Sequence, residues 1–347
     1  MIVILDLSAT EEQIRQIEDM LTAQGLRADV SRGEQKIVIG VIGIPDDARA
    51  HLVEQFQTLP FVERVIPITY PYKRAARDYR PEGTIVRVGG VRIGEQVKEI
   101  AVIAGPCAVE NEEQVLATAR VVKAAGATLL RGGAYKPRTL PYDFQGLGLE
   151  GLKYLAAARA ETGLPVVTEV MSPEDVETVC EYADVLQIGT RNMQNFPLLR
   201  EVGKTRKPVL LKRGFAATVD EWLKAVEYIL RGGNEQVILC ERGIRGFDDA
   251  YTRNVLDLNV VPVLRRLTHL PIAIDPSHGT GRWYLVPIMA KAAIAVGADA
   301  LMVEVHPEPA RALSDAAQSL TPARFAEMME ELRPVAEAVG RCIRETS

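Results

Sequence analysis

Eight short apolar segments recur between residue 98 and the C-terminus, and stretches with the Ala, Leu, Glu and Lys pattern of helices separate most of them. Segments rich in Val, Ile and Leu along their whole length are typical of strands buried on both faces of a sheet. Their alternation with helices over about 250 residues predicts an α/β protein in the form of a (β/α)8 barrel. An open, doubly wound sheet is the alternative, because eight strands can also lie flat. The predicted strands are 100–104, 128–130, 166–168, 185–188, 209–211, 237–239, 272–274 and 301–303.

Residues 1–70 predict a separate small domain. A β-rich run at 2–5 precedes a helix that starts at Thr10, where Gln13 completes a capping box, and that ends at Gly25. The order β-α-β-β-α-β is the split-βαβ arrangement of ferredoxin-like domains, which in enzymes often bind regulatory ligands or form dimers. The remaining elements are expected as strands at 27–31 and 36–42 with a turn at 32–35, a helix at about 46–58 and a strand at 62–68.

The next segment connects this domain to the barrel. Residues 71–84 contain Pro71, Pro81 and several basic side chains without an apolar period, so we expect a solvated linker rather than a basic binding patch. Two short β-rich runs at 85–88 and 91–93 then flank a Gly-Gly pair, which predicts a tight hairpin. The predicted domains are therefore a ferredoxin-like regulatory domain at 1–70, a linker at 71–84 and the barrel with its N-terminal hairpin at 85–347.

Composition restricts the functional class. The chain has 347 residues, and its 41 Lys and Arg against 46 Asp and Glu give a net charge of −5, which excludes an overall basic field for nucleic acid. Four cysteines without a CxxC pair indicate a reducing compartment. The first residues lack the basic start of a signal peptide, and Lys291, Asp299 and Glu304 interrupt the apolar region 283–305. We therefore expect a cytoplasmic protein that neither binds nucleic acid nor spans a membrane.

Polar, mostly charged side chains follow every predicted barrel strand. In (β/α)8 barrels the active site is built from the carboxyl ends of the strands, so these side chains converge on one rim. Loops are polar in general, which could account for two or three of these residues. The general polarity of loops does not explain why a charged residue directly follows nearly all eight strands. We interpret the rim as an active site. Its members, in chain order, are Cys107, Arg131, Lys136, Arg138, Glu169, Arg191, Lys212, Glu241, Arg242, Asp275, His278 and Glu304.

The rim is basic although the whole chain is acidic. Guanidinium groups bind phosphate and carboxylate in a bidentate way, and lysine adds a point charge. Three acids, Glu169, Glu241 and Asp275, are too few to neutralise the bases, so an anionic ligand with at least two phosphates or carboxylates is expected. The bases are Arg131, Lys136, Arg138, Arg191, Lys212 and Arg242.

The same rim predicts a candidate site for a divalent metal. Cys107, His278 and Glu304, with Asp315 in the loop after the last strand, offer a thiolate, an imidazole and carboxylates, a donor set that suits Zn, Mn, Fe or Co. His306 competes as a ligand, because residues i and i+2 of a strand face the same way. Spacing alone therefore leaves both the metal and its ligand set open.

At these residues the chain resembles 3-deoxy-D-arabino-heptulosonate 7-phosphate (DAHP) synthase, the first enzyme of the shikimate pathway. The resemblance covers essentially the whole chain and is to the type I-beta enzymes, which carry a ferredoxin-like N-terminal domain. One departure is Thr190, where the family commonly has Ala before the arginine. The motifs are Ala104–Cys107, Leu130–Thr139, Gln187–Asn192, Leu211–Gly214, Cys240–Gly243, Asp275–His278 and Val303–Pro309.

The resemblance implies specific roles for the rim residues. A divalent metal would be bound by Cys107, His278, Glu304 and Asp315, which leaves His306 outside the ligand set. Erythrose 4-phosphate would be held by the Lys-Pro-Arg-Thr segment, with Arg138 and Thr139 on its phosphate. Phosphoenolpyruvate would be held by Arg131, Lys136, Lys212, Arg242 and Arg191.

The chemistry follows from this inventory as a hypothesis. C3 of phosphoenolpyruvate is a weak carbon nucleophile, and the aldehyde of erythrose 4-phosphate becomes reactive when a Lewis acid withdraws charge from its oxygen. We expect Lys136 to donate a proton to the developing alkoxide and Glu169 to orient the water that adds at C2. The resemblance also suggests that tyrosine or phenylalanine binds between N-terminal domains of neighbouring subunits and closes them over the barrel mouths, in a homotetramer or dimer. A passive dimerisation domain is the alternative.

Three other functions remain open from the sequence. The first is the sister synthase that uses arabinose 5-phosphate (3-deoxy-D-manno-octulosonate 8-phosphate synthase), whose corresponding loop resembles Lys-Ala-Asn-Arg rather than Lys136-Pro-Arg-Thr139. The others are a metal-dependent phosphosugar aldolase and a non-catalytic sensor. A dinucleotide site is not expected, because the GxGxxG at 146–151 does not directly follow a strand.

Overall fold

The computed structural model describes residues 1–6, 8–33, 36–45, 48–66 and 71–345. The chain divides into two compact units, Met1–Lys73 and Arg74–Ser347.

Eight parallel strands of the second unit close into a barrel. Their order is β10-β11-β12-β13-β14-β7-β8-β9, so the ring closes through the pairing of β14 with β7, as in Leu301 opposite Val102. This confirms the predicted (β/α)8 barrel and shows that the open, doubly wound sheet is wrong. The strands are β7 (Ala101–Gly105), β8 (Leu129–Arg131), β9 (Val166–Glu169), β10 (Val185–Ile188), β11 (Val209–Lys212), β12 (Val237–Glu241), β13 (Ile272–Ile274) and β14 (Ala300–Glu304).

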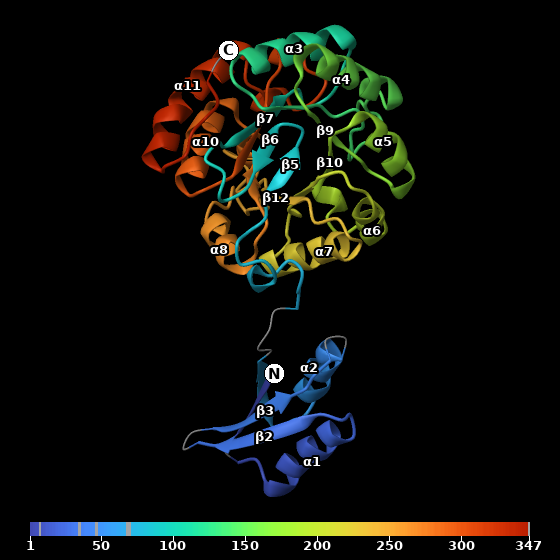
Figure 1. Cartoon of the computed structure of the whole chain (residues 1–347), viewed down its shortest axis with the longest axis vertical. Helices are drawn as coiled ribbons and strands as arrows, with labels where there is room; N and C mark the ends of the chain where they lie inside the picture. The colour runs from blue at the N-terminus through green and yellow to red at the C-terminus, as the bar shows by residue number, and fades with distance from the viewer. Residues whose placement is uncertain (7, 34–35, 46–47, 67–70, 346–347) are drawn as a thin grey trace. The chain divides into compact units, whose positions relative to one another are not determined.

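Helices form a ring around the barrel (Figure 1). Helix α7 illustrates why they form: Thr218 and Glu221 make a capping box at its start, and Trp222, Val226 and Ile229 bury one face. The helices are α3 (Glu112–Ala124), α4 (Leu149–Thr162), α5 (Val176–Tyr182), α6 (Phe196–Lys204), α7 (Val219–Arg231), α8 (Val260–Leu267), the short α9 (Pro276–Thr280), α10 (Val286–Ala295) and α11 (Pro322–Ala338). Short 3-10 turns are η1 (Arg77–Tyr79), η2 (Pro173–Asp175), η3 (Thr190–Asn192), η4 (Trp283–Leu285), η5 (Pro309–Arg311) and η6 (Ala316–Gln318).

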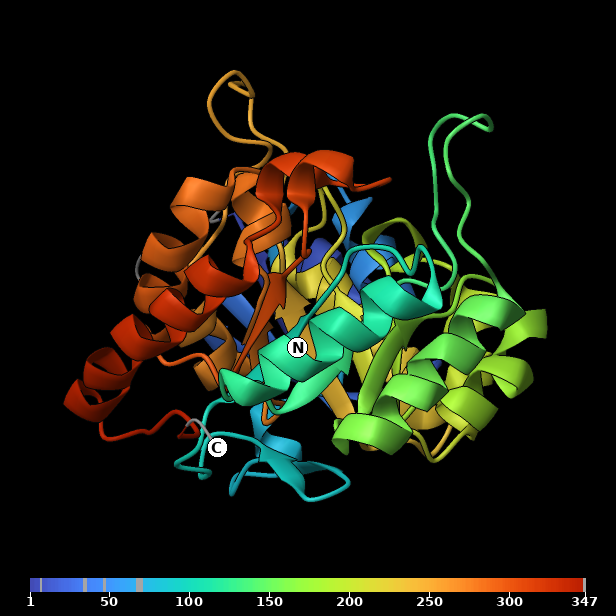
Figure 2. The same ribbon diagram turned by 90° about the horizontal axis from the view of Figure 1, so that it is seen from above.

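A hairpin covers the end of the barrel at which the strands begin. Its strands, β5 (Val86–Val88) and β6 (Val91–Ile93), pair antiparallel around Gly89, which has a φ of 57°. The hairpin was predicted from the Gly-Gly pair, and its valines share one apolar cluster with Ala101 and Leu129 inside the barrel. Figure 2 shows the hairpin on one side of the barrel and the long loops after β8 and β12 on the other. The other end is therefore the one available for a site.

The segment from Arg74 to Thr84 differs from the solvated linker that we expected. The backbone amides of Arg74 and Ala75 both donate to the Glu227 carboxylate at 3.0 Å, and Thr84 Oγ1 lies 2.7 Å from His269 Nδ1. Arg80 pairs with Glu235. Basic residues without an apolar period suggested solvent exposure, but these contacts fasten the segment to the barrel unit.

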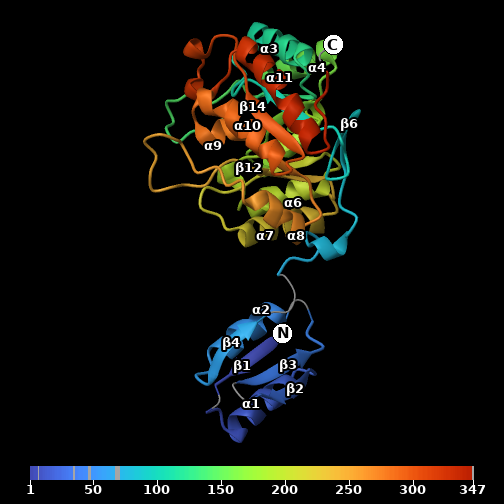
Figure 3. The ribbon, with the colours of Figure 1, turned by 90° about the vertical axis from the view of Figure 1, so that its left-hand side faces the viewer.

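The N-terminal unit has the predicted ferredoxin-like order. Its antiparallel sheet runs β2-β3-β1-β4, which can be followed in Figure 3. Thr10 and Gln13 form the predicted capping box, and helix residues such as Ile17 and Phe56 pack with Val3 and Ile39 on one face of the sheet. Expectations for 34–35, 46–47 and 67–68 lie outside the described residues. The elements are β1 (Ile2–Leu5), α1 (Glu11–Thr22), β2 (Arg27–Arg32), β3 (Ile37–Ile42), α2 (Arg49–Gln57) and β4 (Val62–Ile66).

In the described part of the chain, none of the helices combines the length and hydropathy that crossing a bilayer requires.

Candidate active site

A polar pocket opens at the carboxyl ends of the barrel strands. Most of the residues singled out from the sequence line it, and Cys107 and Glu304 are buried nearby, 2% and 0% exposed. The predicted residues that line the pocket are Arg131, Lys136, Arg138, Thr139, Glu169, Arg191, Lys212, Arg242, His278 and Asp315.

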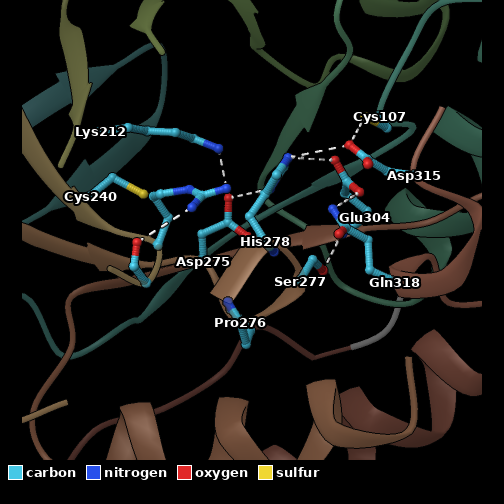
Figure 4. A network of polar contacts seen from close by, with 12 residues as sticks. Cys107, Lys212, Cys240, Asp275, Pro276, Ser277, His278, Glu304, Asp315 and Gln318 are labelled. Atoms are coloured by element: carbon cyan, nitrogen blue, oxygen red, sulfur yellow. Dashed lines mark hydrogen bonds and ion pairs between the residues drawn. The ribbon is translucent and has the colours of Figure 1, made fainter. Parts of the chain in front are cut away.

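Four side chains from separate segments meet beside this pocket. Cys107 follows β7, His278 lies on α9, Glu304 ends β14, and Asp315 precedes η6. One donor atom from each lies within 4.8 Å of the others. His278 Nε2 is 3.3 Å from Glu304 Oε1, and Cys107 Sγ is 3.1 Å from Asp315 Oδ2 (Figure 4). The fold thus brings the four candidate metal ligands together.

A buried aspartate sets the direction of the histidine ring. Asp275 Oδ2 lies 2.7 Å from His278 Nδ1, so Nε2 faces Glu304 and Asp315. Histidines that bind metals usually have the other ring nitrogen held by a carboxylate in this way. Burial opposes ionisation of Asp275, but His278 and Lys212 hold the pKa of its carboxyl well below the ordinary value. Asp275 is therefore a charged hydrogen-bond acceptor.

The cluster suits a divalent cation. Its sulfur, nitrogen and two carboxylate donors match the preferences of Zn, Mn, Fe and Co. Burial and the nearby Glu304 raise the pKa of the Cys107 thiol to about 12, and a bound cation favours the thiolate instead. His306, which the spacing left as a competing ligand, is not in the cluster. Its Nε2 faces Glu110 instead, at 3.4 Å from Oε2.

Three of the six predicted bases have carboxylate partners. Arg131 lies 2.9 Å from Glu304, and Lys212 lies 2.6 Å from Asp275. Arg138 is 3.4 Å from Asp143 and also donates to Ser314 at 2.8 Å. The sequence offered three acids that could neutralise these bases, and among the described residues only Asp275 pairs with one of them. Glu241 pairs instead with Arg213, and Glu169 accepts a hydrogen bond from Gln187.

The other three bases have no carboxylate within 4.0 Å among the residues described. Lys136 donates to Cys107, and Arg191 donates to Thr139 Oγ1 at 3.2 Å. Arg242 is 3% exposed, and burial lowers its pKa. Its guanidinium lies 4.8 Å from the ring centre of Phe215 and makes a long hydrogen bond of 3.4 Å to the Gly243 carbonyl. A buried, unneutralised guanidinium at a pocket wall favours an anionic ligand there.

Three residues of this pocket were not predicted from the sequence, namely Asp143, Phe215 and Arg253. Phe215 lies under three guanidinium groups, those of Arg191, Arg242 and Arg245, at 4.8–5.5 Å from its ring centre. Its apolar character gave no functional signal. Arg253 lies within the long loop between β12 and α8, where no strand end marks it, and its Nη1 is 2.9 Å from Asp315 Oδ1.

The GxGxxG segment at 146–151 has a structural explanation. Gly146 has a φ of 93°, and a Cβ there would lie 2.2 Å from the Ala134 carbonyl oxygen. Beside it, the Lys136 amide donates to the Gln145 carbonyl at 2.9 Å, which closes the base of the loop that carries Arg138 and Thr139. Helix α4 does start after Gly148, but β8 ends far upstream at Arg131. A dinucleotide site is not supported.

A parallel (β/α)8 barrel with a thiolate, imidazole and carboxylate cluster beneath a group of bases defines a metal-dependent enzyme that acts on anionic substrates. The model of the "DAHP synthetase I family" matches residues 75–338, and that of the "DAHP synthase ferredoxin-like domain" matches residues 1–70. The chain belongs to the DAHP synthetase I family.

Similarity to individual proteins supports this family assignment. The chain is 48% identical over 340 residues to phospho-2-dehydro-3-deoxyheptonate aldolase of Thermotoga maritima, covering 98% of this chain and 99% of the relative. The crystal structure of the Thermotoga maritima phospho-2-dehydro-3-deoxyheptonate aldolase (DAHP synthase) matches with a TM-score of 0.90 at 46% identity, and the match covers 99% of each of the two chains. A truncated form of the Thermotoga synthase has a TM-score of 0.72 at 47% identity, covering 78% of this chain and 98% of its own.

The sister enzymes are more distant. A 2-dehydro-3-deoxyphosphooctonate aldolase from Syntrophotalea carbinolica is 34% identical over 254 residues, covering 68% of this chain and 90% of the relative. The whole-chain match to the Thermotoga enzyme therefore favours the heptulosonate synthase over the octulosonate synthase.

Proposed function

We propose that the residues at the carboxyl end of this barrel condense phosphoenolpyruvate with D-erythrose 4-phosphate to give DAHP and inorganic phosphate. The observation that carries this proposal is the position of Lys136 and the rim bases directly beside the four-donor cluster of Cys107, His278, Glu304 and Asp315. One pocket then offers charge neutralisation for two phosphorylated substrates and a site for an electrophilic cation.

Phosphoenolpyruvate occupies the inner part of the pocket in this proposal. Arg242 and Arg191 have no carboxylate partner among the described residues, and both contact Phe215, so they are available to an anion. Arg131, Lys136 and Lys212 complete the binding set, as the resemblance implies. Holding the phosphate and the carboxylate at two points orients C3, which lowers the entropic cost of reaching the transition state.

Erythrose 4-phosphate occupies the outer part, against the loop after β8. Arg138 and Thr139 lie there, and Arg138 is partly neutralised by Asp143 at 3.4 Å. We propose that the sugar phosphate replaces Asp143 as the partner of Arg138. The aldehyde then points inward, toward the four-donor cluster.

Cys107, His278, Glu304 and Asp315 would hold a divalent cation, Mn, Fe, Zn or Co, which would supply Lewis acidity for activation of the aldehyde. C3 of phosphoenolpyruvate attacks the aldehyde carbon, and a carbon–carbon bond forms while the alkoxide takes a proton from Lys136 Nζ. The attack by C3 leaves C2 electron-deficient, so water adds at C2 and one of its protons returns to Lys136 Nζ. The hydroxyl on C2 then passes its proton to the phosphate as the C2–O bond to phosphate breaks, which forms the C2 carbonyl and releases inorganic phosphate. Glu169 is proposed to orient this water, because its Oε1 is buried and has no hydrogen-bond partner in the described structure.

We propose that the N-terminal unit confers feedback control by an aromatic amino acid, tyrosine or phenylalanine, in a homotetramer or dimer. Its ferredoxin-like fold and its match to the family's own ferredoxin-like domain support a ligand-binding role. Control requires two states of different effector affinity. We also propose that the protein acts in the cytoplasm, because both proposed substrates are phosphorylated metabolites.

The test is phosphate release from phosphoenolpyruvate with either aldose. Full-length protein with added Mn²⁺ is expected to turn over erythrose 4-phosphate and to use arabinose 5-phosphate at least about a hundredfold less efficiently, a difference of roughly 3 kcal/mol. Equal or preferred use of arabinose 5-phosphate would contradict the proposed acceptor.

A further inference from the structure

One carboxylate oxygen joins the two halves of the site. Asp275 Oδ2 lies 2.6 Å from Lys212 Nζ and 2.7 Å from His278 Nδ1 (Figure 4). Lys212 belongs to the group of bases, and His278 belongs to the four-donor cluster. The same oxygen atom is therefore shared between a substrate-binding cation and a candidate metal ligand.

Asp275 is fixed on every side, so it cannot leave this arrangement easily. Its side chain is 0% exposed, its amide donates to the Glu241 carbonyl at 2.8 Å, and its Oδ1 accepts the His278 amide at 2.9 Å. A buried carboxylate depends on its partners for compensation of its charge. A displacement of the Lys212 ammonium group therefore changes the hydrogen bond between this oxygen and His278 Nδ1.

We propose that Asp275 is a positioning residue that couples the binding of phosphoenolpyruvate at Lys212 to the binding of the divalent cation at His278. An anion that draws Lys212 Nζ toward itself weakens the Lys212–Asp275 contact. More of the carboxylate charge then faces the Nδ1–H of His278, which makes Nε2 a stronger ligand. This inference rests on the proposed function, because it takes phosphoenolpyruvate as the anion.

The coupling is reciprocal, as linkage requires. Phosphoenolpyruvate should tighten cation binding, and the cation should tighten phosphoenolpyruvate binding by the same factor. Direct attraction between the bound anion and cation contributes to that factor as well. That contribution does not pass through Asp275, so a variant at this position separates the two effects.

The experiment measures Co²⁺ affinity of the metal-free full-length protein with and without saturating phosphoenolpyruvate. The signal is the thiolate-to-cobalt absorption that Cys107 provides. In the wild type the ratio of the two dissociation constants is expected to be on the order of tenfold. In Asp275→Asn, which removes the charge and keeps the shape, the ratio is expected to fall at least about threefold. Asp275→Glu, which keeps the charge, should restore part of it.

A second buried aspartate provides the matched control. Asp299 is also 0% exposed and pairs with Arg265 at 2.7 Å. It lies directly before β14, whereas Asp275 lies directly after β13, so the two aspartates are at opposite ends of the parallel barrel strands. Asp299→Asn is expected to lower thermal stability and to leave the affinity ratio unchanged. An equal fall of the ratio in both variants would mean a general structural effect and would overturn the proposal.

A second measurement uses the wild type, so it can be made even if Asp275→Asn does not fold. In the Zn²⁺-loaded protein with labelled histidine, the Nδ1–H proton resonance of His278 should shift when phosphoenolpyruvate is added. An unchanged resonance, or an unchanged ratio in Asp275→Asn, would overturn the coupling while turnover by the wild type continued. Absence of phosphoenolpyruvate binding by the wild type would instead overturn the proposed function, and the coupling with it.

Discussion

Lys136 Nζ lies 2.9 Å from Cys107 Sγ and 3.1 Å from the Cys107 carbonyl oxygen. Both side chains are buried, and the loops that carry them follow the adjacent strands β8 and β7. The ammonium group is thus placed at the edge of the four-donor cluster, where an alkoxide would develop next to a bound cation. This contact is the geometric basis for assigning proton donation to Lys136.

Replacing Lys136 tests this assignment. Lys136→Met removes the proton donor, and kcat is expected to fall by about 10²–10⁴-fold, the usual range for a general acid. Cobalt binding followed by thiolate absorption should persist, because Lys136 is not one of the four donors. A variant that kept its kcat would show that the proton comes from elsewhere.

Cys107→Ser tests the cation site. Loss of the sulfur donor should weaken divalent metal binding by at least about tenfold and abolish activity in buffer containing a chelator. Cys180→Ser is the matched control, since Cys180 lies outside the cluster on α5. Metal content measured after gel filtration gives the comparison. Full activity of Cys107→Ser with chelator present would exclude the proposed role of the metal.

Arg242→Met tests the anion site. Because Arg242 is buried and has no carboxylate partner among the described residues, its removal should raise the KM for phosphoenolpyruvate by roughly 10–100-fold, equivalent to about 1.5–3 kcal/mol of a charged hydrogen bond. Arg120→Met, at an exposed pair with Glu161, is the control and should leave KM unchanged. Steady-state kinetics at fixed erythrose 4-phosphate would reveal an unaltered KM in Arg242→Met if the assignment is wrong.

Gly105 is expected to tolerate no side chain. A Cβ there would lie 2.1 Å from the Arg131 carbonyl oxygen, so Gly105→Ala forces the backbones of β7 and β8 apart. The free energy of unfolding should fall by about 3 kcal/mol or more. At Gly163, φ is 70° and no atom lies within 4 Å of the Cβ position, so Gly163→Ala should cost only about 1 kcal/mol. Denaturant titrations that ranked the two variants in the opposite order would contradict this packing argument.

Removal of the N-terminal unit tests its proposed regulatory role. Residues 1–73 are the segment to delete, because Arg74 and Ala75 are already hydrogen bonded to Glu227 of the barrel unit. The truncated enzyme should retain turnover and lose inhibition by tyrosine or phenylalanine. Continued inhibition of the truncated enzyme by either amino acid would place the effector site in the barrel.

The sequence predicted the barrel well because its strands are buried on both faces and are therefore apolar throughout. Strand ends could be located for the same reason, because the apolar runs of several strands end at a charged residue, as at Glu169 and Lys212. This gave the predicted pocket residues, and the resemblance supplied the choice of Asp315 over His306. Strand periodicity alone favoured His306 equally, but β14 ends at Glu304, so the alternation of side chains does not extend to residue 306.

Partners contributed by irregular loops could not be predicted. Arg253 reaches Asp315 from a loop without periodicity, and Phe215 is an apolar residue whose role depends on the arginines around it. Residues 71–84 were interpreted as a linker because they combine prolines and basic side chains without an apolar period. The acidic partner of Arg80, Glu235, lies 155 residues further along the chain. Pairings of this kind are set by tertiary structure and leave no local pattern.

The most direct test of the account is anomalous diffraction at the metal edge from crystals grown with Co²⁺ and phosphoenolpyruvate. One strong peak is expected within coordination distance of Cys107 Sγ, His278 Nε2 and the carboxylates of Glu304 and Asp315, with the phosphoenolpyruvate phosphate near Arg242. A peak beside His306 and Glu110 instead, or no peak at the four donors, would contradict it.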